Sequence, residues 1–283
     1  MEQLLPLLER IKNLRSRAAE EMPILCDIGL ECIAAMKSAE VQATTLVEHK
    51  GRTYALLQTG AGDQIRIARP VRKDLFIWDG DEIKALVREV CDGPWQPAKA
   101  SDLECLVYTV QQAVAMYLDL FRPSAARKVV GTFFEAIMAC SLSLVSGLSV
   151  GSGTVHIPDV RQSILTDLGL RRGSKVVLLA ATKTSTRKRL SQPLVQKRIL
   201  EQAFPHPPKS ILIVIGDVQR AGRAGVQHTF TAGQFLLYWK YLTPLDGVYY
   251  IDVPPQAETP AFDGRLKHLW QLFHSDLQSL LAG

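Results

Sequence analysis

The chain has 283 residues, of which 47% are hydrophobic and 22% are charged. This length and composition suit one large globular domain or two unequal ones, and they exclude disordered and fibrous classes. Lysine and arginine number 33 against 28 aspartates and glutamates, a formal net charge of +5, and so mild a surplus does not by itself identify a partner.

The first part of the chain predicts helices followed by a small β unit. Leucines and isoleucine at helical spacing predict a helix over residues 2–20. After a break at Met22-Pro23, a second helix is predicted, with residues 34–40 as its end. Residues 41–78 change to short stretches rich in Thr, Val, Ile and Tyr, with a hairpin turn at Gly60-Ala61-Gly62-Asp63.

A domain boundary is predicted near residue 95. Asp79-Gly80-Asp81 precedes a helix over residues 82–90, and the run Gly93-Pro94-Trp95-Gln96-Pro97 then breaks the pattern. We therefore divide the chain into an N-terminal region, residues 1–95, and a larger unit, residues 96–283. The N-terminal region is expected to bind DNA, dimerise or extend the core.

The larger unit predicts a mixed α/β (α+β) architecture. A helical pair is followed by two strands, a helix and a fully apolar strand, which suggests a central mixed sheet with helices on both faces. The expected elements are helices 102–117 and 125–144 separated by Arg122-Pro123, a loop at 147–153, strands 163–170 and 176–181, a helix from Pro193, and a strand at 211–215.

Targeting signals are not evident in the sequence. No continuous apolar run approaches the roughly 18 residues that span a bilayer. The first residues mix acids and bases within the leucine pattern, unlike an export signal. The odd number of cysteines, with no Cys-x-x-Cys pair, predicts reduced thiols. We expect a cytoplasmic protein that does not contact a membrane.

The segment Gly147-Leu148-Ser149-Val150-Gly151 has the Gly-x-Ser-x-Gly spacing of a hydrolase nucleophile elbow. Such an elbow joins a strand to a helix, whereas here a helix is predicted before the serine and no helix after it. A serine hydrolase with His228 or His268 as its base is therefore a minor alternative.

Two aspartates and a lysine form the first candidate catalytic group. Pro158-Asp159 and Asp167 precede the strand at 176–181, and Lys183 follows it. Antiparallel partners lie about 5 Å apart, so an acid on one strand can meet the lysine on the next. A carboxylate that holds a divalent metal and an ammonium that orients water suit phosphodiester hydrolysis. The alternative is a capped turn and a solvated strand end.

Basic and hydroxyl side chains follow the same strand. Residues 171–198 contain nine bases and no acid, which is typical of polyanion binding. Hydroxyls and guanidinium groups at a strand end bind phosphate oxygens. A solvated loop would explain the charges but not their position after a buried strand. The candidate DNA contacts here are Thr184, Ser185, Arg187, Lys188 and Arg189.

Glu135 lies in an otherwise apolar helix segment, Gly131-Thr132-Phe133-Phe134-Glu135. A carboxylate in such a setting is costly unless a cation or metal partners it. An exposed position at the edge of the helix is an equally good explanation from the sequence alone.

Together these segments resemble the type II restriction endonucleases of the PD-(D/E)XK superfamily, nearest in motif to the branch that includes EcoRII. In that branch a Gly-x-x-Phe-Glu helix precedes a Pro-Asp segment, and a strand then ends in a Lys-Thr-Thr/Ser-x-Lys/Arg-x-Arg-x-x-Gln run. The matching segments here lie in order within residues 127–203: Gly131–Glu135, Pro158-Asp159 and Lys183–Gln192.

The resemblance implies a restriction-endonuclease-like fold, a Mg²⁺ cofactor, Asp159 as metal ligand, Lys183 as the catalytic lysine and Glu135 as a supporting acid and metal ligand. The acid expected two residues before the lysine is Ala181, and the position 13 residues after it, where related enzymes carry an acid, is Gln196. Glutamine can bind a metal through its carbonyl oxygen, and Glu201 and Glu135 are the other candidates for the second acid. Asp167 is the alternative to Asp159, because the sequence does not fix the hairpin register.

The sequence therefore predicts a Mg²⁺-dependent endonuclease that cuts double-stranded DNA at a short specific sequence, and the resemblance implies a homodimer. Base contacts are expected from a polar loop after the apolar strand, because Arg and Gln make bidentate contacts with guanine and adenine. The candidates are Gln219, Arg220 and Arg223. The rivals are a repair or recombination nuclease that cuts by DNA structure and a non-catalytic nucleic-acid-binding protein.

Overall fold

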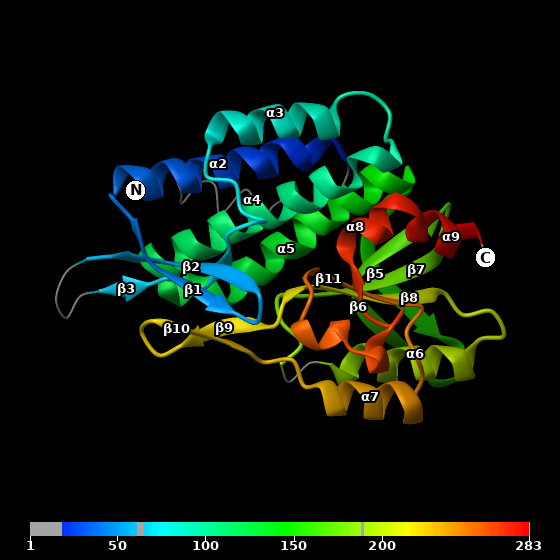
Figure 1. Ribbon diagram of the computed structural model, residues 1–283. Helices are drawn as coiled ribbons and strands as arrows, with labels where there is room; N and C mark the ends of the chain where they lie inside the picture. Colours follow the sequence, from blue (N-terminus) through cyan, green and yellow to red (C-terminus); the bar gives the residue numbers. More distant parts are fainter. Residues whose placement is uncertain (1–18, 61–64, 188–189, 283) are drawn as a thin grey trace.

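The structure is a computed structural model that describes residues 19–60, 65–187 and 190–282. The predicted helix over residues 2–20 and the turn at residues 61–63 lie almost entirely outside these ranges, as do Lys188 and Arg189. Figure 1 shows long helices packed along one side of the sheets and shorter helices on the other side.

Four helices form the first layer: α2 (Met22–Ser38), α3 (Gly80–Cys91), α4 (Ala100–Phe121) and α5 (Pro123–Ser146). The predicted break at Met22-Pro23 lies at the start of the second helix. Helix α2 begins there, because proline in a first turn gives up an N–H that has no helical partner. The side chain of Asp79 caps α3 by accepting hydrogen bonds from the backbone N–H groups of Asp81 (2.8 Å) and Glu82 (3.0 Å), which explains the start predicted there.

The central sheet has six strands in the order β12-β11-β8-β7-β6-β5. The strands β5, β6 and β7 are antiparallel, and β7, β8, β11 and β12 are parallel, so the mixed sheet is confirmed. The expected loop at residues 147–153 is wrong, because β5 already begins at Ser149. The bounds are β5 (Ser149–Ile157), β6 (Gln162–Arg172), β7 (Lys175–Lys183), β8 (Lys209–Gly216), β11 (Gly247–Asp252) and β12 (Lys267–His268).

Alternating side chains of the sheet enter separate cores on its two faces. Leu178, Ala180 and Ile213 pack with α2, α4 and α5 in the largest cluster of buried residues. Ala181 and Leu212 face the opposite way and pack with α6 (Ser191–Ala203) and α7 (Ala232–Tyr241). Helices therefore cover both faces of the mixed sheet, as the sequence predicted.

Helix α5 contains a stretch, residues 128–146, that is long and apolar enough to cross a membrane, with a mean hydropathy of 1.7. Polar residues such as Thr132 and Glu135 interrupt it, so it contains no continuous apolar run. Since 67% of this stretch is buried against the rest of the protein, it serves as a core helix here.

A smaller antiparallel sheet from the N-terminal region lies beside the central sheet (Figure 1). It consists of β1 (Gln42–His49), β2 (Arg52–Thr59), β3 (Arg66–Ile67) and β4 (Val71–Arg72). The hairpin β9 (Val218–Ala221) and β10 (Gly225–His228) packs against it. The expectation of a polar loop at these positions is therefore wrong: the segment is an antiparallel hairpin with Gly222 in its turn at a φ of 65°.

Asp252, the last residue of β11, joins the small sheet to the central sheet. This carboxylate is only 3% exposed and accepts hydrogen bonds from the Tyr54 hydroxyl (2.9 Å) and from Arg72 Nη1 (3.0 Å), while Arg52 Nη1 lies 3.6 Å away. Burial raises the pKa of Asp252, and the arginines oppose that shift. The predicted boundary at residue 95 thus falls between regions that share both a buried ion cluster and a hydrophobic core.

We predict that Asp252→Asn lowers the free energy of unfolding by about 3 kcal/mol, because it removes the buried negative charge that Arg52 and Arg72 share and leaves them only exposed carboxylate partners. Arg72 also pairs with Asp74, an exposed carboxylate, so Asp74→Asn is a matched control that removes a partner of the same arginine. We expect that control to cost less than about 1 kcal/mol. Urea unfolding followed by circular dichroism measures both, and equal losses would contradict the role given to Asp252.

Candidate active site

The carboxyl ends of β7, β8 and β11 meet at one edge of the central sheet, because these three strands are parallel. Lys183 ends β7, Asp217 follows β8 and Asp252 ends β11. Ligand sites of open α/β sheets lie outside such carboxyl ends. The predicted catalytic lysine therefore lies at the edge where a substrate site is expected.

Lys183 forms an ion pair with Asp167 across two neighbouring strands. The distance between Lys183 Nζ and Asp167 Oδ2 is 2.5 Å, and the same oxygen accepts the backbone N–H of Thr182 at 2.8 Å. The lysine side chain is 11% exposed and the aspartate side chain 24% exposed, so solvent screens the pair only in part. These two charge-assisted bonds fix the aspartate side chain beside the lysine.

A β-bulge on β6 places Asp167 in this position. Gly151 pairs with Gly169 and Gly153 pairs with Thr166, so Asp167 and Leu168 together lie opposite Ser152. A bulge of this kind changes the direction in which a strand presents its side chains, and such bulges are frequent next to active sites. Consistent with this change, Leu168 packs toward α5, whereas Ile164 on the same strand packs toward α6.

Glycine is required where the two strands approach at the bulge. A Cβ atom on Gly153 would lie 2.6 Å from the carbonyl oxygen of Leu168 and 2.9 Å from that of Thr166. A Cβ atom on Gly169 would lie 2.9 Å from the Cα of Gly153. By contrast, a Cβ atom on Gly151 would meet nothing within 4 Å. The two glycines that suggested a nucleophile elbow lie elsewhere: Gly147 ends helix α5 at a φ of 67°, and Gly151 lies within β5 in open space.

Asp159, the preferred partner of Lys183 in the sequence analysis, does not contact it in the structure. It is exposed in the 3-10 turn that joins β5 to β6, and Gln162, where β6 begins, is five residues before Asp167. Five strand residues span about 16 Å. The register of the hairpin, which the sequence left open, therefore brings the alternative, Asp167, to the lysine.

The remaining catalytic candidates lie on the two helices that flank the strands. Glu135 is half-buried on α5, the helix packed against β5, β6 and β7. Gln196 on α6 donates a hydrogen bond from its Nε2 to the carbonyl oxygen of Leu165 (2.9 Å), two residues before Asp167. Among the described residues, no three His, Cys, Asp or Glu side chains are grouped closely enough to hold a metal ion.

Four of the predicted DNA contacts line one cleft of about 490 Å³ between the small sheet and the carboxyl edge. They are Thr184, Ser185, Gln219 and Arg220. Arg187 is exposed beside them and donates to Gln219 Oε1 at 2.7 Å, while Arg220 donates to the carbonyl oxygen of Ile67 at 2.6 Å. Arg223 is exposed in the hairpin turn. The loop after β7 and the hairpin after β8 thus form adjoining walls.

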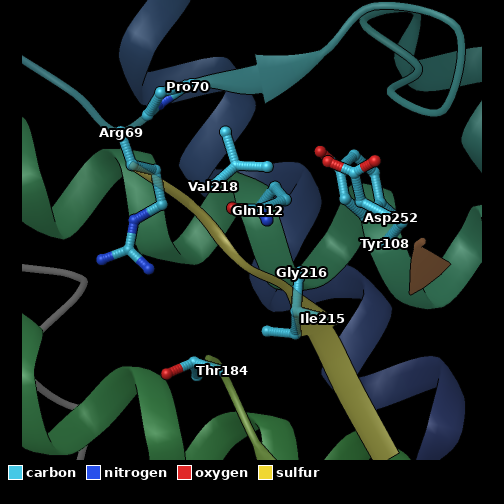
Figure 2. Close-up of a pocket in the computed structure, with 9 residues that line it drawn as sticks. All are labelled: Arg69, Pro70, Tyr108, Gln112, Thr184, Ile215, Gly216, Val218 and Asp252. Atoms are coloured by element: carbon cyan, nitrogen blue, oxygen red, sulfur yellow. The ribbon is translucent and has the colours of Figure 1, made fainter. Parts of the chain in front are cut away.

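A smaller cavity of about 40 Å³ adjoins the cleft and shares Arg69, Thr184 and Val218 with it (Figure 2). Figure 2 shows Arg69 and Asp252 on either side of the chain segment that leaves β8, with Thr184 below that segment. Arg69 is held by Asp119 through bonds of 2.8 and 3.0 Å. The N-terminal region therefore contributes a cationic side chain to the wall opposite Thr184.

The serine hydrolase alternative is not supported by these positions. Ser149 follows helix α5 and begins strand β5, the reverse of a strand-to-helix elbow. His228 stacks on His49 with ring centroids 4.9 Å apart, and burial together with the nearby His49 lowers the pKa of His228 to about 4. His268 caps the short helix α8 (Leu269–Gln271). None of these side chains adjoins the cleft.

Sequence reasoning missed Asp217, Asp252 and Arg69. Asp217 follows the apolar run 211–215 after a single glycine, and Asp252 directly follows residues 247–251. A carboxylate at the end of a buried strand is a signal that a search for such strands could use. Strand β11 was overlooked because Gly247 and two tyrosines interrupt its aliphatic pattern. Arg69 carries no local signal, since its position depends on how the small sheet packs.

Comparison with solved structures identifies the fold. A crystal structure of the type IIP restriction endonuclease Kpn2I superposes with a TM-score of 0.80 and 24% sequence identity, over 99% of this chain and 97% of that chain. A complex of the restriction endonuclease PspGI with substrate DNA gives a TM-score of 0.45 and 13% identity, over 71% of this chain and 92% of that chain.

No protein-family model matches the chain, and no curated protein matches it. The chain therefore has the fold of a restriction endonuclease, as the superposition on Kpn2I shows over nearly its whole length. The placement near the EcoRII branch stays a prediction.

We predict that Gly153→Ala displaces Asp167 from Lys183, because the new methyl group would overlap backbone oxygens of the bulge rather than a movable side chain. Gly151→Ala adds the same methyl group to the same strand in open space and is the control. We expect Gly153→Ala to lower the unfolding free energy by about 2 kcal/mol, within the range of overpacking, and Gly151→Ala to leave it nearly unchanged. The structures of both variants report the distance between Asp167 and Lys183, and an unchanged distance in Gly153→Ala would contradict the role given to this glycine.

Proposed function

We propose that the protein is a Mg²⁺-dependent endonuclease that hydrolyses phosphodiester bonds of double-stranded DNA at a specific short sequence. The observation that carries the proposal is the Lys183–Asp167 pair at the carboxyl edge of a restriction-endonuclease fold, next to a cleft with basic and hydroxyl side chains. A carboxylate and an ammonium at one strand end supply the two charges that phosphodiester hydrolysis needs.

The available donors fit a lightly coordinated Mg²⁺ ion. Mg²⁺ usually keeps several waters and needs only one or two carboxylates besides substrate phosphate oxygens. Asp167 would supply the carboxylate, the Gln196 carbonyl oxygen would stand where related enzymes carry an acid, and Glu135 would support them from α5. When bound there, the ion would polarise the phosphate and lower the pKa of an attacking water.

The residues of the chain perform the other functions of the reaction. The ammonium of Lys183 orients the water for in-line attack and offsets the negative charge that develops on the phosphate oxygens. The hydroxyls of Thr184 and Ser185, in the cleft wall immediately after the lysine, donate to the DNA backbone and fix the position of the scissile bond.

Sequence recognition is proposed for the two adjoining walls of the cleft. Arg187 and Gln219 already bond to each other, so their donors and acceptors present one joint surface to a base edge. Arg220 and Arg223 extend this surface along the hairpin. A protein that cuts both strands of a symmetric site would act as a homodimer. Exposed apolar side chains on α6 and the neighbouring β6, which include Leu165, Val195 and Ile199, support an interface beside the site.

We predict that wild-type protein cuts phage and plasmid DNA into discrete fragments with Mg²⁺ and not with EDTA. Lys183→Ala and Asp167→Asn should lower the cleavage rate by at least about 100-fold, because each removes one charge of the site. Asp159→Asn, which removes an exposed carboxylate from the same hairpin, should change it by less than about threefold.

Sequencing of the fragment ends distinguishes the alternatives. Cuts that follow DNA structure rather than sequence would favour a repair nuclease. If wild-type protein does not cleave and Lys183→Ala only weakens DNA binding, the protein is a non-catalytic binder. Loss of activity in Asp159→Asn but not in Asp167→Asn would contradict the assignment of the carboxylate.

A further prediction concerns the Mg²⁺ requirement. Gln196→Ala should raise the Mg²⁺ concentration for half-maximal cleavage by about fivefold, because it removes a neutral oxygen ligand next to Asp167. Gln192→Ala removes an exposed glutamine from the same helix and is the control. A titration of initial rate against Mg²⁺ measures both variants, and equal midpoints would show that Gln196 is not a ligand.

A further inference from the structure

Asp217, the residue that follows β8, is fully buried and holds the loop that follows Lys183. Its exposed fraction is 0%, and its carboxylate accepts three hydrogen bonds. Two come from Thr186, from the backbone N–H at 2.7 Å and the hydroxyl at 2.6 Å, and the third comes from the Tyr250 hydroxyl at 2.9 Å. Thr186 itself is only 2% exposed, so it faces inward while its neighbours Ser185 and Arg187 are accessible.

The chemistry of these bonds makes the arrangement specific. A buried carboxylate needs hydrogen-bond donors to replace its hydration, and here all three donors are neutral. Since two of them belong to one threonine, the loop cannot move away from Asp217 without leaving a buried carboxylate short of donors. The loop is thereby fixed three residues after the proposed catalytic lysine.

Asp217 also lies at the start of the β9–β10 hairpin, which is the second segment proposed to contact bases. Its carbonyl oxygen accepts the backbone N–H of Thr229 at 2.7 Å, which closes the base of the β9–β10 hairpin. The hairpin and the loop after β7 meet again through Arg187 and Gln219 at 2.7 Å. The loop and the hairpin are therefore joined at their bases by a buried contact and farther out by an exposed one.

We infer that Asp217 is a positioning residue that holds these two DNA-reading segments as one unit, and that this unit determines sequence discrimination. The inference deepens the proposed function and rests on it. Lys183 is held separately, by strand β7 and by Asp167. Loss of the contacts that join the loop to the hairpin therefore affects base recognition more than the rate of cleavage. A base contact loses its selectivity when its two hydrogen bonds cannot form together.

The test compares four variants with wild-type protein. Asp217→Asn cannot accept all three hydrogen bonds, and Thr186→Val removes the hydroxyl donor, so both loosen the loop. Thr186→Ser keeps the hydroxyl and should restore the wild-type behaviour. Tyr250→Phe removes a bond to the same carboxylate from β11 and leaves both bonds from Thr186 to Asp217 in place. It therefore controls for general loss of stability.

The first readout is the ratio of kcat/KM for the recognised sequence to kcat/KM for sites that differ by one base pair. We expect this ratio to fall by about tenfold or more in Asp217→Asn and Thr186→Val, the factor that one base contact supplies. In Tyr250→Phe and Thr186→Ser it should stay within about twofold of wild type. If Asp217→Asn does not fold, Thr186→Val carries the comparison.

The second readout, hydrogen–deuterium exchange, does not depend on cleavage. Asp217→Asn should speed exchange in the loop after β7 and in residues 218–228 together, whereas Tyr250→Phe should not. A lower melting temperature with an unchanged discrimination ratio, or faster exchange in only one segment, would overturn the inference. If wild-type protein does not cleave DNA, the proposed function is wrong. The exchange data then show separately whether the loop after β7 and the β9–β10 hairpin are held as one structural unit.

Discussion

The ion pair between Lys183 and Asp167 is the contact on which the rest of this structure depends. The two side chains lie on adjacent antiparallel strands, and the pairing of β6 with β7 ends next to them at Leu168 and Ala180. Beyond that point the carboxylate of Asp167 accepts the backbone N–H of Thr182 that a neighbouring strand would otherwise accept. The bulge on β6, where Gly153 and Gly169 approach closely, also helps to place Asp167. It changes the side of the sheet to which the side chains of β6 point, at the position of this acid. A site that lacks an acid at Ala181 thereby still has a carboxylate beside its lysine.

The buried acids that follow β8 and β11 extend this edge into a larger assembly. Asp217 holds the loop after Lys183, and Asp252 holds the small N-terminal sheet. Both carboxylates are almost completely buried, so each is satisfied only when the segments around it are in place. As a result, the cleft has three walls of different origin: the loop after β7, the hairpin after β8, and the segment around Arg69. The N-terminal region is thus part of the cleft as well as part of the core.

Local patterns in the sequence predicted much of this fold. The pair of helices around Pro123, the strands at 163–170 and 176–181 and the apolar strand before Gly216 all follow from periodicity and turn residues, and the structure confirms them. What the sequence could not supply were non-local relations. The register of β6 against β7 decides whether Asp159 or Asp167 meets Lys183, and the face on which Asp167 lies depends on a bulge where β6 pairs with β5. Strand β11, the β9–β10 hairpin and the contacts of Arg69 likewise arise from packing between distant segments.

The most direct test of the central claim is a crystal structure of the protein with its DNA substrate and Ca²⁺, an ion that binds oxygen ligands and can hold the complex before cleavage. The account predicts that the scissile phosphate lies beside Lys183 and that Asp167 is the carboxylate that would hold the cation. A phosphate and cation located at Asp159, or DNA bound on a face away from the carboxyl ends of β7 and β8, would contradict it.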